Sequence, residues 1–162
     1  MGRPVLESRA LRERILGGIY AAHGDRDAAL NDYNAALRID PTLVPALYNR
    51  ALNYSAQGNN SGAIADYSEA IRLSPTVALL RVHRGLIYIR QGDYQSALKD
   101  EDEAIRLEPK LGLAYLFRAM AYGKLGNADK AADDIATAIR LDPSLARNVK
   151  VNQGSAPSAP SR

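Results

Sequence analysis

Small and bulky apolar residues recur along this chain with a period of 34 residues. When the recurring proline is taken as position 32, the units are 10–43, 44–77, 78–111 and 112–145. Positions 8, 20 and 27 hold only alanine or glycine in every unit, at spacings that let two helices approach closely. Position 11 supplies bulk beside these gaps with Tyr20, Tyr54, Tyr88 and Tyr122. A period of this length predicts supersecondary units that stack on one another.

A glycine and a proline mark the ends of two helices in each unit. Glycine at position 15 favours left-handed backbone after a first helix, helix A, and occurs as Gly24, Gly58, Gly92 and Gly126. An Asp or Asn follows directly and is a good N-cap for a second helix, helix B. Helix B is then ended by Pro41, Pro75, Pro109 and Pro143. Each unit is therefore predicted to be a helix–turn–helix whose apolar face is buried only against its neighbours.

These columns resemble the tetratricopeptide repeat (TPR). Unit 2 reads Leu47-x2-Arg50-Ala51-x2-Tyr54, then Ala63-x3-Tyr67 and Pro75, against the family pattern W-x2-L-G-x2-Y…A-x3-F…P. The resemblance covers residues 10–145 and implies an all-α, right-handed superhelical solenoid of antiparallel helix pairs. Residues 1–9 are expected to extend the first helix. Residues 146–162 are expected to form a short cap and a disordered Pro/Ser-rich tail.

Charged residues also follow the period. Position 7 holds Arg50, Arg84 and Arg118 in units 2 to 4, and position 23 holds Asp32, Asp66, Asp100 and Asp134. A buried arginine needs a partner, and a carboxylate can accept from it in bidentate fashion. Because unit 1 has Leu16 in place of the arginine, we expect each Asp to pair with the Arg of the next unit (Asp32–Arg50, Asp66–Arg84, Asp100–Arg118). The alternative is a row of arginines that binds anions.

Unit 3 departs from the other units at two positions that normally hold large residues. Position 4 is Arg81 and position 24 is Glu101. The two side chains either form a compensating ion pair or both reach solvent along their aliphatic stems. The charged run over residues 99–103 has neither the glycine nor the spacing of a calcium loop, so a solvated convex face is expected there.

The resemblance implies that A helices line a concave face on which positions 2, 5, 6, 9, 12 and 13 meet a ligand. Units 3 and 4 would present an apolar stripe there, and such an exposed patch usually marks a partner site. The candidate groove consists of Arg14, Tyr48, Asn49, Leu52, Leu79, Val82, His83, Leu86, Ile89, Arg90, Leu113, Leu116, Phe117, Met120 and Lys124. A C-terminal segment of the same chain is the other candidate for covering part of this stripe.

These observations predict a non-catalytic adaptor or scaffold for protein–protein interaction. Its partner would be a protein or peptide segment with apolar anchors and some acidic character, since basic Arg14, Arg90 and Lys124 border the stripe. The alternative function is self-assembly into a dimer or head-to-tail oligomer through the terminal repeats.

Composition argues against several other functions. The chain has no cysteine, and its only histidines are His23 and His83, so no catalytic set, metal site or cofactor is predicted. The net charge is +3 and the arginines are dispersed, which does not suggest a nucleic-acid partner. No apolar run approaches the roughly 20 residues of a membrane span. A cytoplasmic location is expected, unless a signal segment has been removed to give an exported protein.

Overall fold

The structure, a computed structural model, describes residues 26–147, and every regular element within them is helical. The elements in chain order are α2 (Arg26–Ile39), α3 (Val44–Ala56), α4 (Asn60–Leu73), α5 (Ala78–Gln91), α6 (Tyr94–Leu107), α7 (Gly112–Lys124), α8 (Ala128–Leu141) and the 3₁₀ turn η1 (Pro143–Leu145). The expected helix A of unit 1, its N-terminal extension and the expected tail lie outside the described residues.

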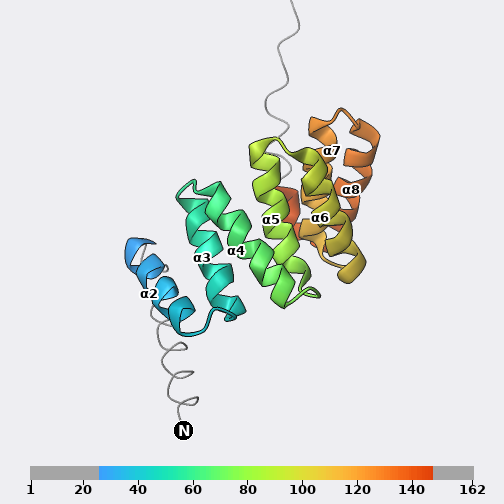
Figure 1. The fold of residues 1–162 in the computed structure, drawn as a ribbon. Coiled ribbons are helices and arrows are strands. Elements are labelled where there is room, and N and C mark those ends of the chain that lie inside the picture. The colour runs from blue at the N-terminus through green and yellow to red at the C-terminus, as the bar shows by residue number, and fades with distance from the viewer. Residues whose placement is uncertain (1–25, 148–162) are drawn as a thin grey trace, which may run out of the picture.

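The helices follow one another in a row, as Figure 1 shows, and each helix packs chiefly on its neighbours in sequence. The closest pairs are α3 with α4, α5 with α6, and α7 with α8, which are the A and B helices of units 2, 3 and 4. Short turns join the members of each pair, so the two helices run antiparallel. The all-α solenoid expected from the period is therefore confirmed for this part of the chain.

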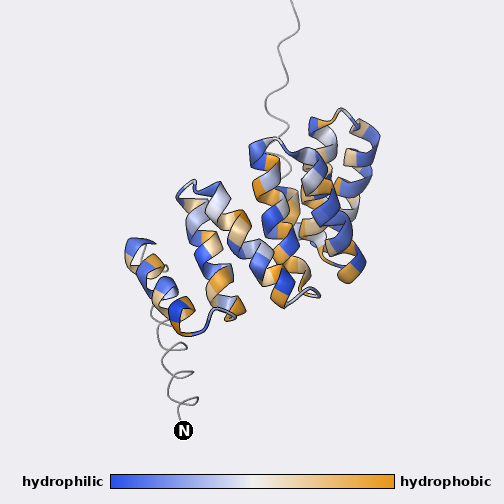
Figure 2. Ribbon diagram, in the orientation of Figure 1, coloured by the Kyte–Doolittle hydropathy of each residue, from blue (hydrophilic) through white to orange (hydrophobic). Residues whose placement is uncertain are grey.

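The small-residue columns form the contacts between helices. At position 27, Ala36, Ala70, Ala104 and Ala138 are all completely buried. Position 20 is buried in every unit as well, and so is position 8 of units 2 to 4. Figure 2 shows that polar and apolar residues alternate around each helix, which is the pattern of helices that bury one stripe. The packing columns were thus predictable from the sequence.

The predicted turn chemistry is present in units 2 to 4. Gly58, Gly92 and Gly126 have φ values of 78°, 81° and 78°, the left-handed conformation expected after helix A. Helix B ends two residues before each proline.

The predicted N-caps are correct for two of the described B helices. Asn59 accepts a hydrogen bond from the backbone N–H of Gly62, and Asp93 accepts one from that of Ser96. Asn127 occupies the N-cap position of α8 as expected, but its side chain makes no cap hydrogen bond to the described residues.

Two glycines without close neighbours, Gly92 directly after α5 and Gly123 within α7, allow the effect of backbone strain to be measured alone. A Cβ at Gly92 or at Gly123 would meet no described heavy atom within 4 Å. Only Gly92 has a positive φ. Gly92→Ala should therefore destabilise the protein by about 1 kcal/mol. The matched change Gly123→Ala, within α7, should stabilise it by about 0.5–1 kcal/mol. Urea denaturation of the two variants tests this, and equal effects would contradict it.

The arginines of position 7 pair within their own units, so the predicted pairing between units is wrong. Arg50 Nε and Nη2 each lie 2.7 Å from a carboxylate oxygen of Asp66. Arg84 binds Asp100 at 2.8 and 2.7 Å, and Arg118 binds Asp134 with both distances 2.8 Å. Position 7 of helix A and position 23 of helix B face each other across the antiparallel pair, which is why the bidentate contact forms there.

The third guanidinium nitrogen makes the link to the preceding unit. Arg50 Nη1 donates to Asn34 on α2 at 2.8 Å. Arg84 Nη1 donates to Ser68 on α4 at 2.9 Å, and Arg118 Nη1 donates to Asp102 on α6 at 2.8 Å. These acceptors all occupy position 25 of the preceding unit. Each arginine therefore joins three helices, and position 25 rather than position 23 fixes the register between units.

Arg81 and Glu101 of unit 3 neither pair with each other nor both reach solvent, so both expectations for them are wrong. Glu101 is 0% exposed, and within residues 26–147 neither of its carboxyl oxygens has a hydrogen-bond partner. Arg81 is largely buried and lies near Asp100, with Nη1 at 3.9 Å from the carboxylate. Glu101 fits because its carboxyl group occupies the space that a side chain at Gly85 would need.

Burial of Glu101 has an electrostatic consequence. Desolvation, with a smaller contribution from the Asp100 carboxylate, raises the pKa of Glu101 to about 10. The side chain is therefore a neutral carboxylic acid at pH 7. The charged run over residues 99–103 is not uniformly solvated either, because Asp100 and Glu101 are buried while Lys99 and Asp102 are exposed.

Candidate functional site

The A helices of adjacent units face one another along one side of the row. Tyr48 on α3 and His83 on α5 share a hydrogen bond of 3.0 Å between Oη and Nε2. Two helical turns further along, Arg90 donates to the hydroxyl of Ser55 at 3.1 Å. In both pairs the residues are 35 positions apart, which is one repeat plus one residue. We call the surface formed by α3, α5 and α7 the A-helix face.

An aromatic cluster connects α3, α4 and α5 at this face. The His83 ring stacks on Tyr67 with an interplanar angle of 9° and centroids 5.9 Å apart. Tyr48 meets both rings edge-on, at 6.1 Å from Tyr67 and 5.4 Å from His83. Burial lowers the pKa of His83 below its ordinary value and raises the pKa of both tyrosines. The imidazole is therefore neutral at pH 7 and serves as a hydrogen-bonding and stacking group.

The lowered pKa of His83 gives a testable pH dependence. In the unfolded chain His83 binds a proton near pH 6.5, whereas in the folded protein it binds one only at a lower pH. Protonation of His83 therefore favours the unfolded chain, and the free energy of unfolding falls as the pH falls through this range. Wild type should therefore lose stability relative to His83→Phe when urea denaturation is repeated from pH 7 to pH 5. Tyr48→Phe, which keeps the imidazole, should retain the wild-type pH dependence. An unchanged difference between wild type and His83→Phe would contradict this assignment.

Part of the predicted apolar stripe is buried and is not available to a ligand. Val82 is 0% exposed, and Ile89 and Leu116 are each 7% exposed. Val82 lies in a cluster with Phe117 of the next A helix, and Ile89 lies in one with Met120 and Phe117. Positions 5 and 12 of these A helices therefore pack against the following A helix. The expectation that these three residues line an open groove is wrong.

Leu116 has no following unit to pack on, and the C-terminal turn takes that role. Leu145 of η1 is 5% exposed and clusters with Leu116 and Ala138. Its Cδ1 approaches Gly112 so closely that a Cβ there would lie 3.2 Å away. A C-terminal segment of the chain was the other candidate for covering part of the stripe, and Leu145 does so at Leu116. The signal in the sequence is an apolar residue two positions after Pro143, at the end of unit 4.

The remaining candidate residues fall into three groups. Leu113, Phe117 and Met120 are half-buried and pack against the core clusters. Leu79 and Leu86 are half-buried, and Leu52 is 37% exposed; these three have no assigned place in the core clusters of the described residues. Asn49 is half-buried, Arg90 and Lys124 are exposed, and Arg14 lies outside the described residues.

Family models were compared with the whole sequence. Two models described as tetratricopeptide repeat match residues 48–112 and 113–145, and one described as TPR repeat matches residues 17–58. Together the matches extend over residues 17–145, which includes the described helices. The chain belongs to the TPR family. No curated protein matches its sequence.

Solved structures show the same TPR fold. A crystal structure of MamA has a TM-score of 0.78 at 22% identity, with coverage of 90% of this chain and 86% of that chain. The MamA fragment "41-end" from Desulfovibrio magneticus RS-1 has a TM-score of 0.78 at 18% identity, covering 89% and 86%. TTC0263, described as a thermophilic TPR protein in Thermus thermophilus, has a TM-score of 0.75 at 24% identity, covering 90% and 83%.

The TPR fold bears on the kind of function to expect. Stacked helical repeats present extended surfaces and are typical of protein-interaction modules. Across residues 26–147, no group of three or more His, Asp or Glu side chains is placed to hold a metal ion. Within the same residues, no helix has both the length and the hydropathy required to cross a bilayer.

Proposed function

We propose that this TPR chain is a non-catalytic adaptor that binds a segment of a protein partner across its A-helix face. The observation that carries the proposal is a set of leucines outside the core clusters of the described residues, Leu52 on α3 with Leu79 and Leu86 on α5. Apolar side chains left at a surface between polar neighbours are typical of partner sites. They give an extended or helical segment apolar anchor points.

Charge separation between the two sets of helices favours an acidic segment. The sequences of α3, α5 and α7 contain no Asp or Glu, whereas α2, α4, α6 and α8 all contain acidic residues. The position 7 arginines of the A helices are neutralised by their partners on the B helices. Arg90 and Lys124 are exposed and have no ion pair within the described residues. The A-helix face is thus positively charged at its surface.

Selection from a displayed library of random peptides tests this proposal. Wild type should enrich peptides that combine apolar anchors with Asp or Glu. Leu86→Glu should weaken their binding by about tenfold or more, as loss of a central apolar contact does. Arg90→Glu should weaken it mainly at low salt. The matched control is Ala136→Glu on the exposed surface of α8. If Leu86→Glu and Ala136→Glu bind the peptides equally well, the A-helix face is not the site.

Self-assembly through the last repeat has less support. Leu145 already covers part of the apolar surface that a following unit would meet, at Leu116 and Ala138. The exposed residues of α8 are small or charged, as Ala132, Asp133 and Ala136 are, which is not the apolar composition of a stable interface. Light scattering over a hundredfold range of concentration separates the two functions. A constant mass of one chain is expected, and a mass that doubles would favour assembly.

A further inference from the structure

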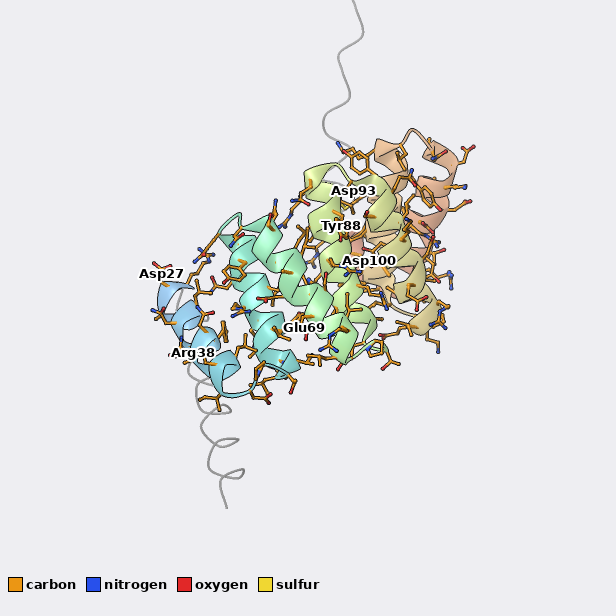
Figure 3. All side chains as sticks on the ribbon, viewed as in Figure 1. Asp27, Arg38, Glu69, Tyr88, Asp93 and Asp100 are labelled. Atoms are coloured by element: carbon orange, nitrogen blue, oxygen red, sulfur yellow. The ribbon has the colours of Figure 1, made fainter. Side chains whose placement is uncertain are left out.

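A second candidate site lies where α2, α3 and α4 meet, away from the A-helix face leucines. A cleft of about 460 Å³ opens there beside the guanidinium of Arg50, a volume within the usual range of about 300–1,000 Å³ for ligand pockets. Its apolar part is formed by Leu37, Pro41 and Leu47. Arg38 on α2 and Glu69 on α4, both labelled in Figure 3, contribute one charge of each sign to its lining.

Hydrogen-bond acceptors within the chain surround the edge of the Arg50 guanidinium. Nε and Nη2 donate to Asp66, and Nη1 donates to Asn34, so all three nitrogens already have acceptors. Its Cζ lies 5.8 Å from the centroid of the Tyr54 ring. A ligand in the cleft would therefore meet the planar face of a fixed guanidinium more readily than free N–H donors. Such a face favours an aromatic ring over an anion.

Unit 4 shows what fills the corresponding space. Arg118, the equivalent of Arg50, lies within 6.0 Å of the Tyr122 ring and 5.5 Å of the Tyr115 ring. Tyr122 corresponds to Tyr54, but Tyr115 occupies position 4, where unit 2 has Leu47. The Tyr115 hydroxyl donates a hydrogen bond of 3.2 Å to the backbone carbonyl of Pro109.

Unit 2 has the corresponding arginine and tyrosine, Arg50 and Tyr54, without the second ring. Leu47 is shorter than a tyrosine, and the cleft lies beside it. Pro41, the equivalent of Pro109, lines this cleft. We propose that the cleft binds a tyrosine side chain of a partner polypeptide. The ring would stack on Arg50, and the hydroxyl would donate to the Pro41 carbonyl, as Tyr115 does within the chain. The carboxylates of Asp66 and Glu69 in the lining, each already paired with an arginine, suit a neutral phenol better than a phosphorylated one.

The probe for this site is N-acetyl-tyrosinamide, titrated into the full chain while NMR follows the Arg50 Nε–Hε signal and the Leu47 methyl groups. Saturable shifts at these two residues are expected. N-acetyl-phenylalaninamide, which lacks the hydroxyl, should bind about fivefold more weakly, as loss of one neutral hydrogen bond implies. A tyrosine within a tripeptide should bind at least as well as the free amide if a polypeptide is the natural source.

Two reciprocal substitutions decide the assignment. Leu47→Tyr recreates the arrangement of unit 4 and should abolish the shifts at Arg50. Tyr115→Leu should open an equivalent cleft in unit 4, so that the probe then shifts the Arg118 Nε–Hε signal as well. Tyr115→Leu keeps the proposal testable if Leu47→Tyr overpacks the core and fails to fold. Absence of saturable shifts at Arg50 in wild type, or no new shift at Arg118 in folded Tyr115→Leu, would overturn the proposal.

Discussion

Replacing Glu101 by glutamine should stabilise the protein, by an amount that grows with pH. The side chain is completely buried against Gly85, and its oxygens have no hydrogen-bond partner within the described residues. Glutamine has nearly the same shape and no proton to lose. Urea denaturation of wild type and Glu101→Gln at pH 5, 7 and 9 measures the effect.

The sign follows from the two states of Glu101. Its pKa is about 10 in the folded protein, against an ordinary value of 4.5. Below pH 4.5 both states hold the proton, so ionisation of Glu101 contributes no difference. Between pH 4.5 and about 10 the unfolded chain releases the proton while the folded protein keeps it, so stability falls as the pH rises. With about 1.4 kcal/mol per pH unit, the glutamine variant should gain roughly 3 kcal/mol at pH 7 and more at pH 9.

Glu103→Gln is the matched control, because Glu103 lies on the same helix, pairs with Arg106 and has a lowered pKa. Its substitution should not reproduce the gain at any pH. If Glu101→Gln is no more stable than wild type at pH 9, Glu101 is ionised in the folded protein.

Replacing Arg84 by methionine should cost about 3 kcal/mol of unfolding free energy, within the range for breaking a buried ion pair. The guanidinium binds Asp100 in bidentate fashion and reaches Ser68 on the preceding unit. Only 18% of the Arg84 side chain and 6% of the Asp100 side chain are exposed. The carboxylate would keep only the more distant Arg81, at 3.9 Å, as a basic neighbour. Chemical denaturation measures the loss.

Three further variants identify which interaction of Arg84 accounts for the loss of stability. Ser68→Ala removes the link between units, together with the hydrogen bond that Ser68 Oγ donates to the Ile64 carbonyl of its own helix, and should cost about 1 kcal/mol. Adding Asp100→Leu to Arg84→Met should recover part of the stability, since the unpaired carboxylate is removed while the largely buried Arg81 loses its neighbour. Arg72→Met, which breaks an exposed pair with Glu69, should have little effect. An equally small loss for Arg84→Met would show that the buried pair contributes little to stability.

The features that repeat identically in every unit were predictable from the sequence. Left-handed glycines such as Gly92, helix-ending prolines and fully buried alanines such as Ala70 each follow from a local steric rule. Each rule predicts the same local structure in every unit, so the four copies support one another. This is why the helices and their order agree with the expectation.

The partner choices were not predictable, because a period does not specify which neighbour a side chain meets. Arg50 is 16 residues before Asp66 and 18 after Asp32, and both distances recur in every later unit. Only the geometry of the antiparallel pair selects the first. Val82 was misplaced for a related reason, since position 5 contacts the next A helix and so lies inside the stack. The burial of Glu101 depends on Gly85, a pair that occurs in one unit only.

The separation of acidic residues onto the B helices also bears on the kinetics of encounter. A segment rich in Asp or Glu would be repelled from the outer helices and drawn toward α3, α5 and α7, so that productive collisions become more frequent than random orientation allows. Because this field acts before contact, added salt would reduce the association rate constant far more than it changes the dissociation rate constant. On the proposed function, the same stack of helices would select the direction from which a partner arrives as well as the surface that it binds.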